Sequence, residues 1–131
     1  MGGPDFDVDR FVGETRTTVL ASWRKGDARQ FPKGDTRPYP RSGVNVEADG
    51  GEYVFGDLSR QVEQALGFLA KHGDELRRVT ARAEHTYALL DFTSAFTEDT
   101  MTKTVEFPPK LVQAAADAGL GLTVSFYPVA P

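Results

Sequence analysis

Apolar residues recur at helical spacing in one long segment of the chain, and this period predicts its clearest helix. Asp57 is a residue type that often caps helices, and it stands just before the segment. The apolar stripe that follows comprises Leu58, Val62, Ala65, Leu66 and Leu69. Lys71-His72-Gly73 is expected to end this helix, because basic residues and a glycine are typical of helix C-termini. A short helical segment is expected to follow at 74–79.

Two shorter helices are predicted from residue types that are typical of helix starts and ends. Acidic residues precede apolar Val8, Phe11 and Val12 in segment 5–13, which favours a short helix with its acids at the positive N-terminal end. Pro108 and Pro109 suit the first turn of another helix, which is expected to run to Gly119.

Alternating apolar and polar positions, together with β-branched residues, predict strands. The segments with this character are 15–23, 43–48, 83–92, 101–107 and 120–128. Asp49-Gly50-Gly51 is expected to form a turn, with a short returning strand at 52–55. We expect 101–107 to return as the hairpin partner of 83–92, with 93–100 as a polar connection. Strands and helices mix without βαβ repetition, which indicates an α+β fold: a single sheet of four to six mostly antiparallel strands with two or three helices packed on one face.

The composition indicates one domain, 1–131, and excludes several chemistries. The chain is 40% hydrophobic and 26% charged, which is typical of a globular domain. It has no cysteine, which excludes disulfides, thiolate metal sites and a cysteine nucleophile. The two histidines, His72 and His85, stand in unrelated contexts, so we expect no metal, and no cofactor is indicated because phosphate-binding loops are missing. Long apolar runs and a leader-like N-terminus are also missing, so we expect a cytoplasmic protein without membrane contact.

The charge is unevenly distributed along the chain. Residues 10–41 hold eight basic and three acidic residues, whereas the whole chain has a net charge of -4. Segment 24–42 within it is rich in proline and glycine, and we expect a long basic loop there. An acidic chain with one basic segment disfavours nucleic-acid binding but allows a local surface for anions.

Within this loop the phrase Lys-Gly-Asp-x-Arg occurs twice, at 25–29 and 33–37. The glycine of each copy is expected to adopt a positive φ in a tight turn, and Asp27 with Arg29 and Asp35 with Arg37 are expected to pair locally. Aromatic residues recur every eight positions through the same segment, at Trp23, Phe31 and Tyr39. These aromatics either pin the loop onto its own domain or form a surface for a protein or an anionic ligand. The candidate binding residues are Trp23, Arg24, Lys25, Asp27, Arg29, Arg37 and Tyr39.

A second candidate site lies in the segment 83–92. His85, Tyr87 and Leu89 alternate along one strand face with Asp91 further along, which places groups suited to acid-base chemistry together. The alternative is an ordinary sheet face whose polar groups satisfy one another. A pocket joining His85 and Tyr87 to the 23–41 loop is the arrangement that favours a small-ligand binder or an enzyme.

Several motifs together resemble a bacterial family catalogued as domain of unknown function 4279. They are Asp7-Val8-Asp9, Trp23-Arg24-Lys25-Gly26-Asp27, Ser42-Gly43, Asp57-Leu58, Phe107-Pro108-Pro109-Lys110-Leu111 and Ser125-Phe126-Tyr127-Pro128. The resemblance implies the α+β architecture and assigns no activity, substrate or catalytic residue. Members of the family begin with a strand that the first six residues are too short and too rich in glycine and proline to form. We therefore expect an exposed sheet edge, suited to a homodimer or to a partner's strand.

These observations favour a bacterial binding or protein-interaction module over an enzyme, since no catalytic motif is present. By analogy, small bacterial proteins of this kind serve as immunity-type or accessory partners. We expect the first copy of the repeated phrase, which directly follows a predicted strand, to make most of the contact with a partner.

Overall fold

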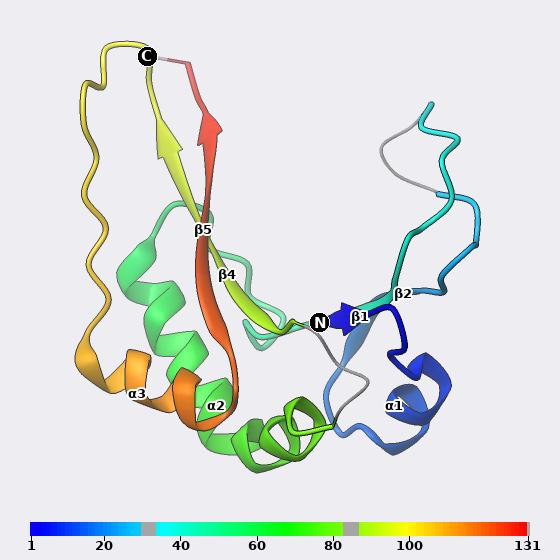
Figure 1. Ribbon diagram of the computed structural model, residues 1–131. Coiled ribbons are helices and arrows are strands. Elements are labelled where there is room, and N and C mark those ends of the chain that lie inside the picture. Colours follow the sequence, from blue (N-terminus) through cyan, green and yellow to red (C-terminus); the bar gives the residue numbers. More distant parts are fainter. Residues whose placement is uncertain (30–33, 83–86, 131) are drawn as a thin grey trace.

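The computed structural model describes residues 1–29, 34–82 and 87–130, which fold into two halves joined through one long helix (Figure 1). The N-terminal half holds β1 (Gly2–Gly3), α1 (Val8–Glu14), β2 (Val19–Trp23) and β3 (Ser42–Val46). The C-terminal half holds α2 (Leu58–Thr80), β4 (Leu89–Phe96), α3 (Pro109–Asp117) and β5 (Gly121–Pro128). The mixed α+β class expected from the sequence is confirmed.

In the N-terminal half, three antiparallel strands in the order β1-β3-β2 pack against α1. The Asp7 carboxylate caps α1 by accepting the Arg10 backbone N–H at 3.0 Å, which confirms the expected short helix. The buried residues of this core come from the segment before α1, from α1 itself, from β3 and from α2: Phe6, Val8, Phe11, Val44 and Val79.

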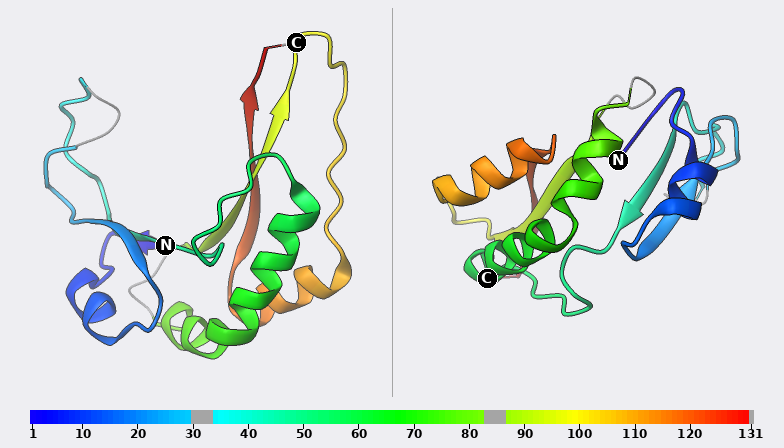
Figure 2. Two further views of the ribbon diagram at one scale, coloured as in Figure 1. Left: turned by 180° about the vertical axis from the view of Figure 1, so that it is seen from behind. Right: turned by 90° about the horizontal axis from the view of Figure 1, so that it is seen from below.

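In the C-terminal half, β4 and β5 form a parallel pair, and α2 and α3 share one core with it (Figure 2). Even-numbered residues of β4, such as Leu90 and Phe92, are buried against the helices, while Leu89 and Asp91 face away. Leu111 of α3 is fully buried in the same core.

A single sheet of four to six mostly antiparallel strands is therefore wrong, because the described strands form one sheet of three and one of two. An isolated antiparallel bridge between Gly2 and Tyr87 links the halves, with both N–H···O distances at 3.1 Å. The expectation that the first residues cannot form a strand is also wrong for Gly2 and Gly3. Glycine allows the close approach, since a Cβ on Gly2 would lie 2.4 Å from the Ser42 carbonyl oxygen.

Two strand predictions in the C-terminal half are wrong as well. Residues 101–107 form no strand but run as an extended connection (Figure 1). Strand β4 extends to Phe96, into the first half of the segment 93–100 that was expected to be a polar connection. The partner of β4 is β5, reached through α3, because this crossover lets both helices cover the apolar face of the pair. Residues 52–55 likewise add no strand.

Helix α2 does not end at Gly73 but runs on to Thr80 as one helix of 23 residues. Leu76 and Val79 continue its buried stripe beyond the glycine. Their burial outweighs the cost of about 1 kcal/mol that a glycine imposes inside a helix.

Candidate functional site

The basic loop 24–41 is the connection of a β-hairpin between β2 and β3, and its two ends pair with each other. The Gly26 N–H donates to the Tyr39 carbonyl at 2.8 Å, the Tyr39 N–H donates to the Asp27 carbonyl at 3.0 Å, and Ala28 bridges Pro38. Gly26 and Gly34 have φ angles of 90° and 93°, which confirms the positive φ expected in both copies of the repeated phrase. Lys33 and Phe31 lie outside the described residues.

The first copy of the phrase is anchored to the N-terminal half. Trp23 packs over Gly43 so closely that a Cβ on this glycine would lie 2.5 Å from the Trp23 ring. The Lys25 backbone N–H donates to the Ser42 hydroxyl at 2.9 Å, and the Arg24 guanidinium pairs with Asp9 of α1. Three motifs that are far apart in the sequence thus meet at the hairpin base, where they have a structural role.

In the second copy, Asp35 holds two arginines. Arg37 binds its carboxylate through Nε at 3.1 Å and Nη2 at 2.8 Å, which confirms the local pair expected from the sequence. The expected Asp27–Arg29 pair is wrong, because Arg29 reaches across to Asp35, with Nε 3.8 Å from Oδ2. The side-chain and backbone hydrogen bonds of Arg37, followed by the charges of Arg37 and Arg29, hold the pKa of Asp35 well below its ordinary value.

A shallow groove of about 390 Å³ lies where the hairpin base meets Tyr87, just before β4. We call it the Tyr87 groove, and it is lined by Trp23, Arg29, Tyr39, Pro40, Arg41 and Tyr87. The Trp23 and Tyr39 rings stack with their centroids 5.8 Å apart, and the Arg29 guanidinium lies 5.3 Å from the Tyr39 centroid. The Arg41 guanidinium lies 5.7 Å from the centroid of Tyr87. Two arginines thus lie over aromatic rings along one groove.

The groove brings together Trp23, Arg29 and Tyr39 with Tyr87, which the sequence assigned to a separate candidate site. Arg24, Lys25, Asp27 and Arg37 do not line it. Arg41 was missed, because it lies outside the repeated phrase and its position over Tyr87 depends on contact between the two halves. Its side chain is exposed and makes no ion pair with a carboxylate in the described part of the chain.

The predicted acid-base cluster is only partly visible, since His85 lies outside the described residues. Asp91 on the same face is bound by β5, because its Oδ1 accepts the Thr123 hydroxyl at 2.9 Å and the Ser125 hydroxyl at 2.8 Å. These contacts match the alternative reading of a sheet face whose polar groups satisfy one another.

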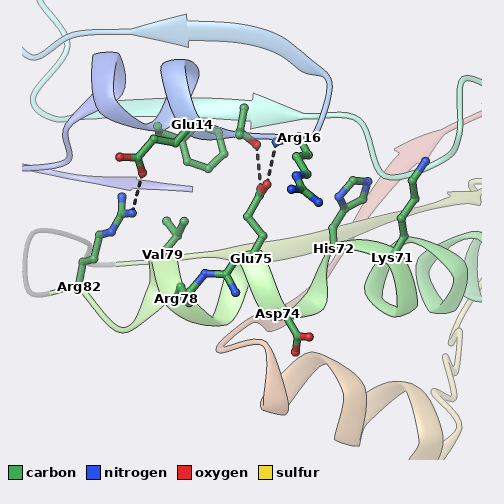
Figure 3. Close-up of a pocket in the computed structure, with 11 residues that line it drawn as sticks. Glu14, Arg16, Lys71, His72, Asp74, Glu75, Arg78, Val79 and Arg82 are labelled. Atoms are coloured by element: carbon green, nitrogen blue, oxygen red, sulfur yellow. Dashed lines mark hydrogen bonds and ion pairs between the residues drawn. The ribbon is translucent and has the colours of Figure 1, made fainter.

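A second pocket, of about 480 Å³, lies between α1 and the C-terminal part of α2 (Figure 3). Glu75 is fixed there by the Thr15 hydroxyl at 2.8 Å and the Arg16 backbone N–H at 2.7 Å. Glu14 pairs with Arg82 at 3.0 Å, and the hydrogen bonds from Arg82 and Arg10 lower the pKa of Glu14. No local pattern in the sequence indicates this pocket, because its residues come from segments about sixty positions apart.

The cationic side chains of this pocket face almost as many acids. The cationic residues of its lining are Arg16, Lys71, Arg78 and Arg82, and the acidic residues are Glu14, Asp74 and Glu75. A nearly balanced lining attracts anions weakly, so the Tyr87 groove is the stronger binding candidate.

Comparisons with known proteins leave the resemblance noted above as a prediction. No protein-family model, no curated protein and no solved structure matches this chain. Within residues 1–29, 34–82 and 87–130, no three His, Cys, Asp or Glu side chains gather closely enough to hold a metal ion. Across these same ranges, every helix is too short or too polar to cross a membrane.

Proposed function

We propose that this chain is a non-enzymatic protein-binding module that takes an acidic segment of a partner protein in the Tyr87 groove. The observation that carries the proposal is Arg41, an exposed guanidinium held over the Tyr87 ring without a carboxylate partner among the described residues. A guanidinium on an aromatic face is oriented and weakly hydrated, and it keeps its edge N–H groups for a planar carboxylate. The chain would then act as the immunity-type or accessory partner expected from its sequence.

Other arginines of the hairpin support this surface because they already have carboxylate partners. Arg24 is engaged with Asp9, and Arg29 and Arg37 are engaged with Asp35. Because these charges are already paired, they position the groove rather than compete for the partner. A surface that is ordered before binding loses less conformational entropy when the partner arrives.

The proposal is tested by capture from an extract of the organism that encodes the chain. The unchanged protein, Arg41→Glu and a control variant, Lys110→Glu, are immobilised and the retained proteins are compared by mass spectrometry. Lys110 is an exposed residue at the start of α3, far from the groove in the sequence, and its replacement makes the same change of charge. We expect one protein to be retained by the unchanged chain and by Lys110→Glu but lost with Arg41→Glu. Retention of the same proteins by all three would contradict the proposal.

The alternative expected from the sequence, a small anionic ligand bound between the hairpin and the sheet, is separated by fluorescence. Trp23 is the single tryptophan of the chain and lines the groove, so its emission reports on occupancy. A saturable change with succinate or citrate that disappears in Arg41→Glu would favour the small ligand. We expect no such change, because the groove is shallow and a small ligand would stay largely exposed to solvent.

A further inference from the structure

A crevice of about 440 Å³ separates the two sheets and is bordered by one strand of each. On one side lies β3 from Val44 to Val46, and on the other lies β4 from Leu89 to Thr93. We call this crevice the strand slot. The N-terminus lies at the place where β1 and the start of β4 approach each other (Figure 1).

One end of the strand slot is already occupied by a strand. Gly2 of β1 is antiparallel both to Gly43 of β3 and to Tyr87, which precedes β4. Met1 continues the pairing, because its carbonyl accepts the Val44 N–H at 2.9 Å and its amino group donates to the Val44 carbonyl at 3.0 Å. At this point the edges of the two sheets are therefore separated by the width of one strand.

Past the pairs Val44–Met1 and Tyr87–Gly2, the next backbone groups that face the strand slot are those of Val46, Leu89 and Asp91. Because N–H and C=O groups alternate sides along a strand, those of Val46 point the same way as those of Val44. On β4, the groups of Leu89 and Asp91 point the same way as those of Tyr87, which bind Gly2. No backbone hydrogen bond joins these slot-facing groups of Val46, Leu89 or Asp91 to any other described residue.

The far end of the strand slot is closed by a side chain that imitates a peptide group. The Gln61 amide oxygen accepts the Thr93 N–H at 2.9 Å, and its nitrogen donates to the Thr93 carbonyl at 3.0 Å. The open edges between Met1 and Gln61 thus match a short piece of extended polypeptide.

We propose that the strand slot binds an extended segment of a partner protein, which runs in the direction of β1 and joins the two sheets into one. Such β-strand addition derives its affinity from main-chain hydrogen bonds and its specificity from alternate side chains. Here the added strand makes main-chain hydrogen bonds with Val46 on one edge and with Leu89 and Asp91 on the other.

The register of β1 determines which side chains the partner must carry. In the register set by Gly2, the second residue of the added strand beyond Met1 lies between Leu90 and Val46. Its side chain points to the face of the sheets that the helices cover. Ala65, Phe68 and Leu76 line the strand slot on this face, so the partner residue there is apolar.

The next position lies between Asp91 and Glu47, on the opposite face, so the partner residue there is basic. Asp49 adds a third acid to the lining, and among the described residues that line the strand slot the positive group is the amino group of Met1. Leu20, Tyr53 and Leu89 border the same opening with 63%, 68% and 50% of their surfaces exposed. An added strand would cover part of this exposed apolar surface. The acidic lining and the buried apolar face together select a partner strand that alternates basic and apolar residues.

The test is an NMR titration of the isotope-labelled full chain with the peptide acetyl-Ser-Val-Lys-Val-Thr-amide. We expect saturable changes in the amide signals of Val46, Leu89 and Asp91. Asp91→Lys is expected to weaken binding about tenfold or more, because an attraction becomes a repulsion. Glu63→Lys makes the same charge change at an exposed residue of α2 outside the lining and is expected to bind like the unchanged chain.

A second probe makes the same comparison without altering the protein. The peptide with Glu in place of Lys is expected to bind the unchanged chain about tenfold more weakly or worse. Equal binding of both peptides, signal changes centred on the hairpin, or no change at millimolar peptide would overturn the proposal. Signals of the same three amides that move on dilution without peptide would show a second copy in the strand slot, which overturns the assignment to a partner protein.

Discussion

At the scale of single residues, Gln61 shows how one polar side chain takes the place of a strand. Its amide binds both backbone groups of Thr93 and donates to the Val54 carbonyl at 3.0 Å. A primary amide has the same donor and acceptor as a peptide group, so it satisfies a strand edge as a neighbouring strand would. In the sequence Gln61 is only a polar position beside Val62, because its partner stands 32 residues away.

Gln61→Ala is expected to lower the free energy of unfolding by about 1–3 kcal/mol, since it leaves half-buried backbone groups of Val54 and Thr93 without partners. Gln113→Ala is the matched control, because the exposed Gln113 amide binds a side chain one helical turn away, Asp117, at 2.8 Å. The control is expected to cost less than about 0.5 kcal/mol. Urea unfolding followed by circular dichroism measures both, and equal losses would contradict the role given to Gln61.

At the scale of elements, the hairpin and helix α3 show two different sources of order. The described part of the hairpin is held by paired charges and stacked rings, since Asp35 holds two arginines and Tyr39 stacks on Trp23. Helix α3 owes its place to burial, because Leu111 and Ala115 are almost completely excluded from solvent. The hairpin is therefore sensitive to pH and salt, whereas α3 is sensitive to the volume of its side chains.

The hairpin prediction concerns pH. Because the pKa of Asp35 is lower in the folded chain than its ordinary value of 3.8, its ion pairs stabilise the hairpin above that value and are lost as the pH falls toward the lowered pKa. Arg37→Ala is expected to raise the pKa of Asp35 toward 3.8, measured by an NMR titration of its carboxyl carbon. Arg10→Ala, which removes an arginine that pairs with Glu14 instead, is expected to leave it unchanged. An identical Asp35 titration in all three proteins would refute the assignment.

The helix prediction concerns packing. Leu111 is 0% exposed, so Leu111→Ala is expected to lower the free energy of unfolding by about 2–5 kcal/mol. Its neighbour Val112 is 47% exposed. Val112→Ala is expected to change the free energy of unfolding by no more than about 0.5 kcal/mol. Thermal and urea unfolding check both values, and a Leu111→Ala protein as stable as Val112→Ala would show that α3 does not pack as described.

At the scale of the whole molecule, the two halves are held together by α2 and by the bridge at Gly2. Helix α2 contributes Leu69 and Leu76 to one core and Val79 to the other, so it spans both. The bridge between Gly2 and Tyr87 is the point where the sheets approach each other, and the Tyr87 groove and the strand slot both border this joint.

Gly2→Ala is expected to open this joint, because its Cβ would lie 2.4 Å from the Ser42 carbonyl oxygen and 2.9 Å from the Gly43 Cα. Amide hydrogen exchange should become faster at Tyr87 and Val44 while β5 amides keep their protection. Gly13→Ala, at a position with no heavy atom within 4 Å of the added Cβ, is the control and should leave the bridge amides unchanged. Unchanged exchange in Gly2→Ala would mean that the bridge does not hold the halves together.

The sequence by itself determined the elements whose signals are local. The Asp57 cap, the proline start of α3, the alternation of β3 and the glycine turns at Gly26 and Gly34 were all predicted, because each depends on neighbouring residues. It also singled out the basic, aromatic loop 24–42 by composition and charge, although the pairing of its two ends was not predicted.

Only the tertiary structure decided which elements pair and which of the singled-out residues meet. The parallel pairing of β4 with β5 joins residues 32 positions apart, such as Leu89 and Gly121, and Arg41 lies over a ring 46 positions away. The extension of α2 beyond Gly73 likewise depends on burial against other elements. The same holds for the strand slot, whose open edges belong to two strands that no local pattern relates. The physical reason is that alternation and period report which face of a segment is apolar, while burial against the rest of the chain selects the partner that covers it.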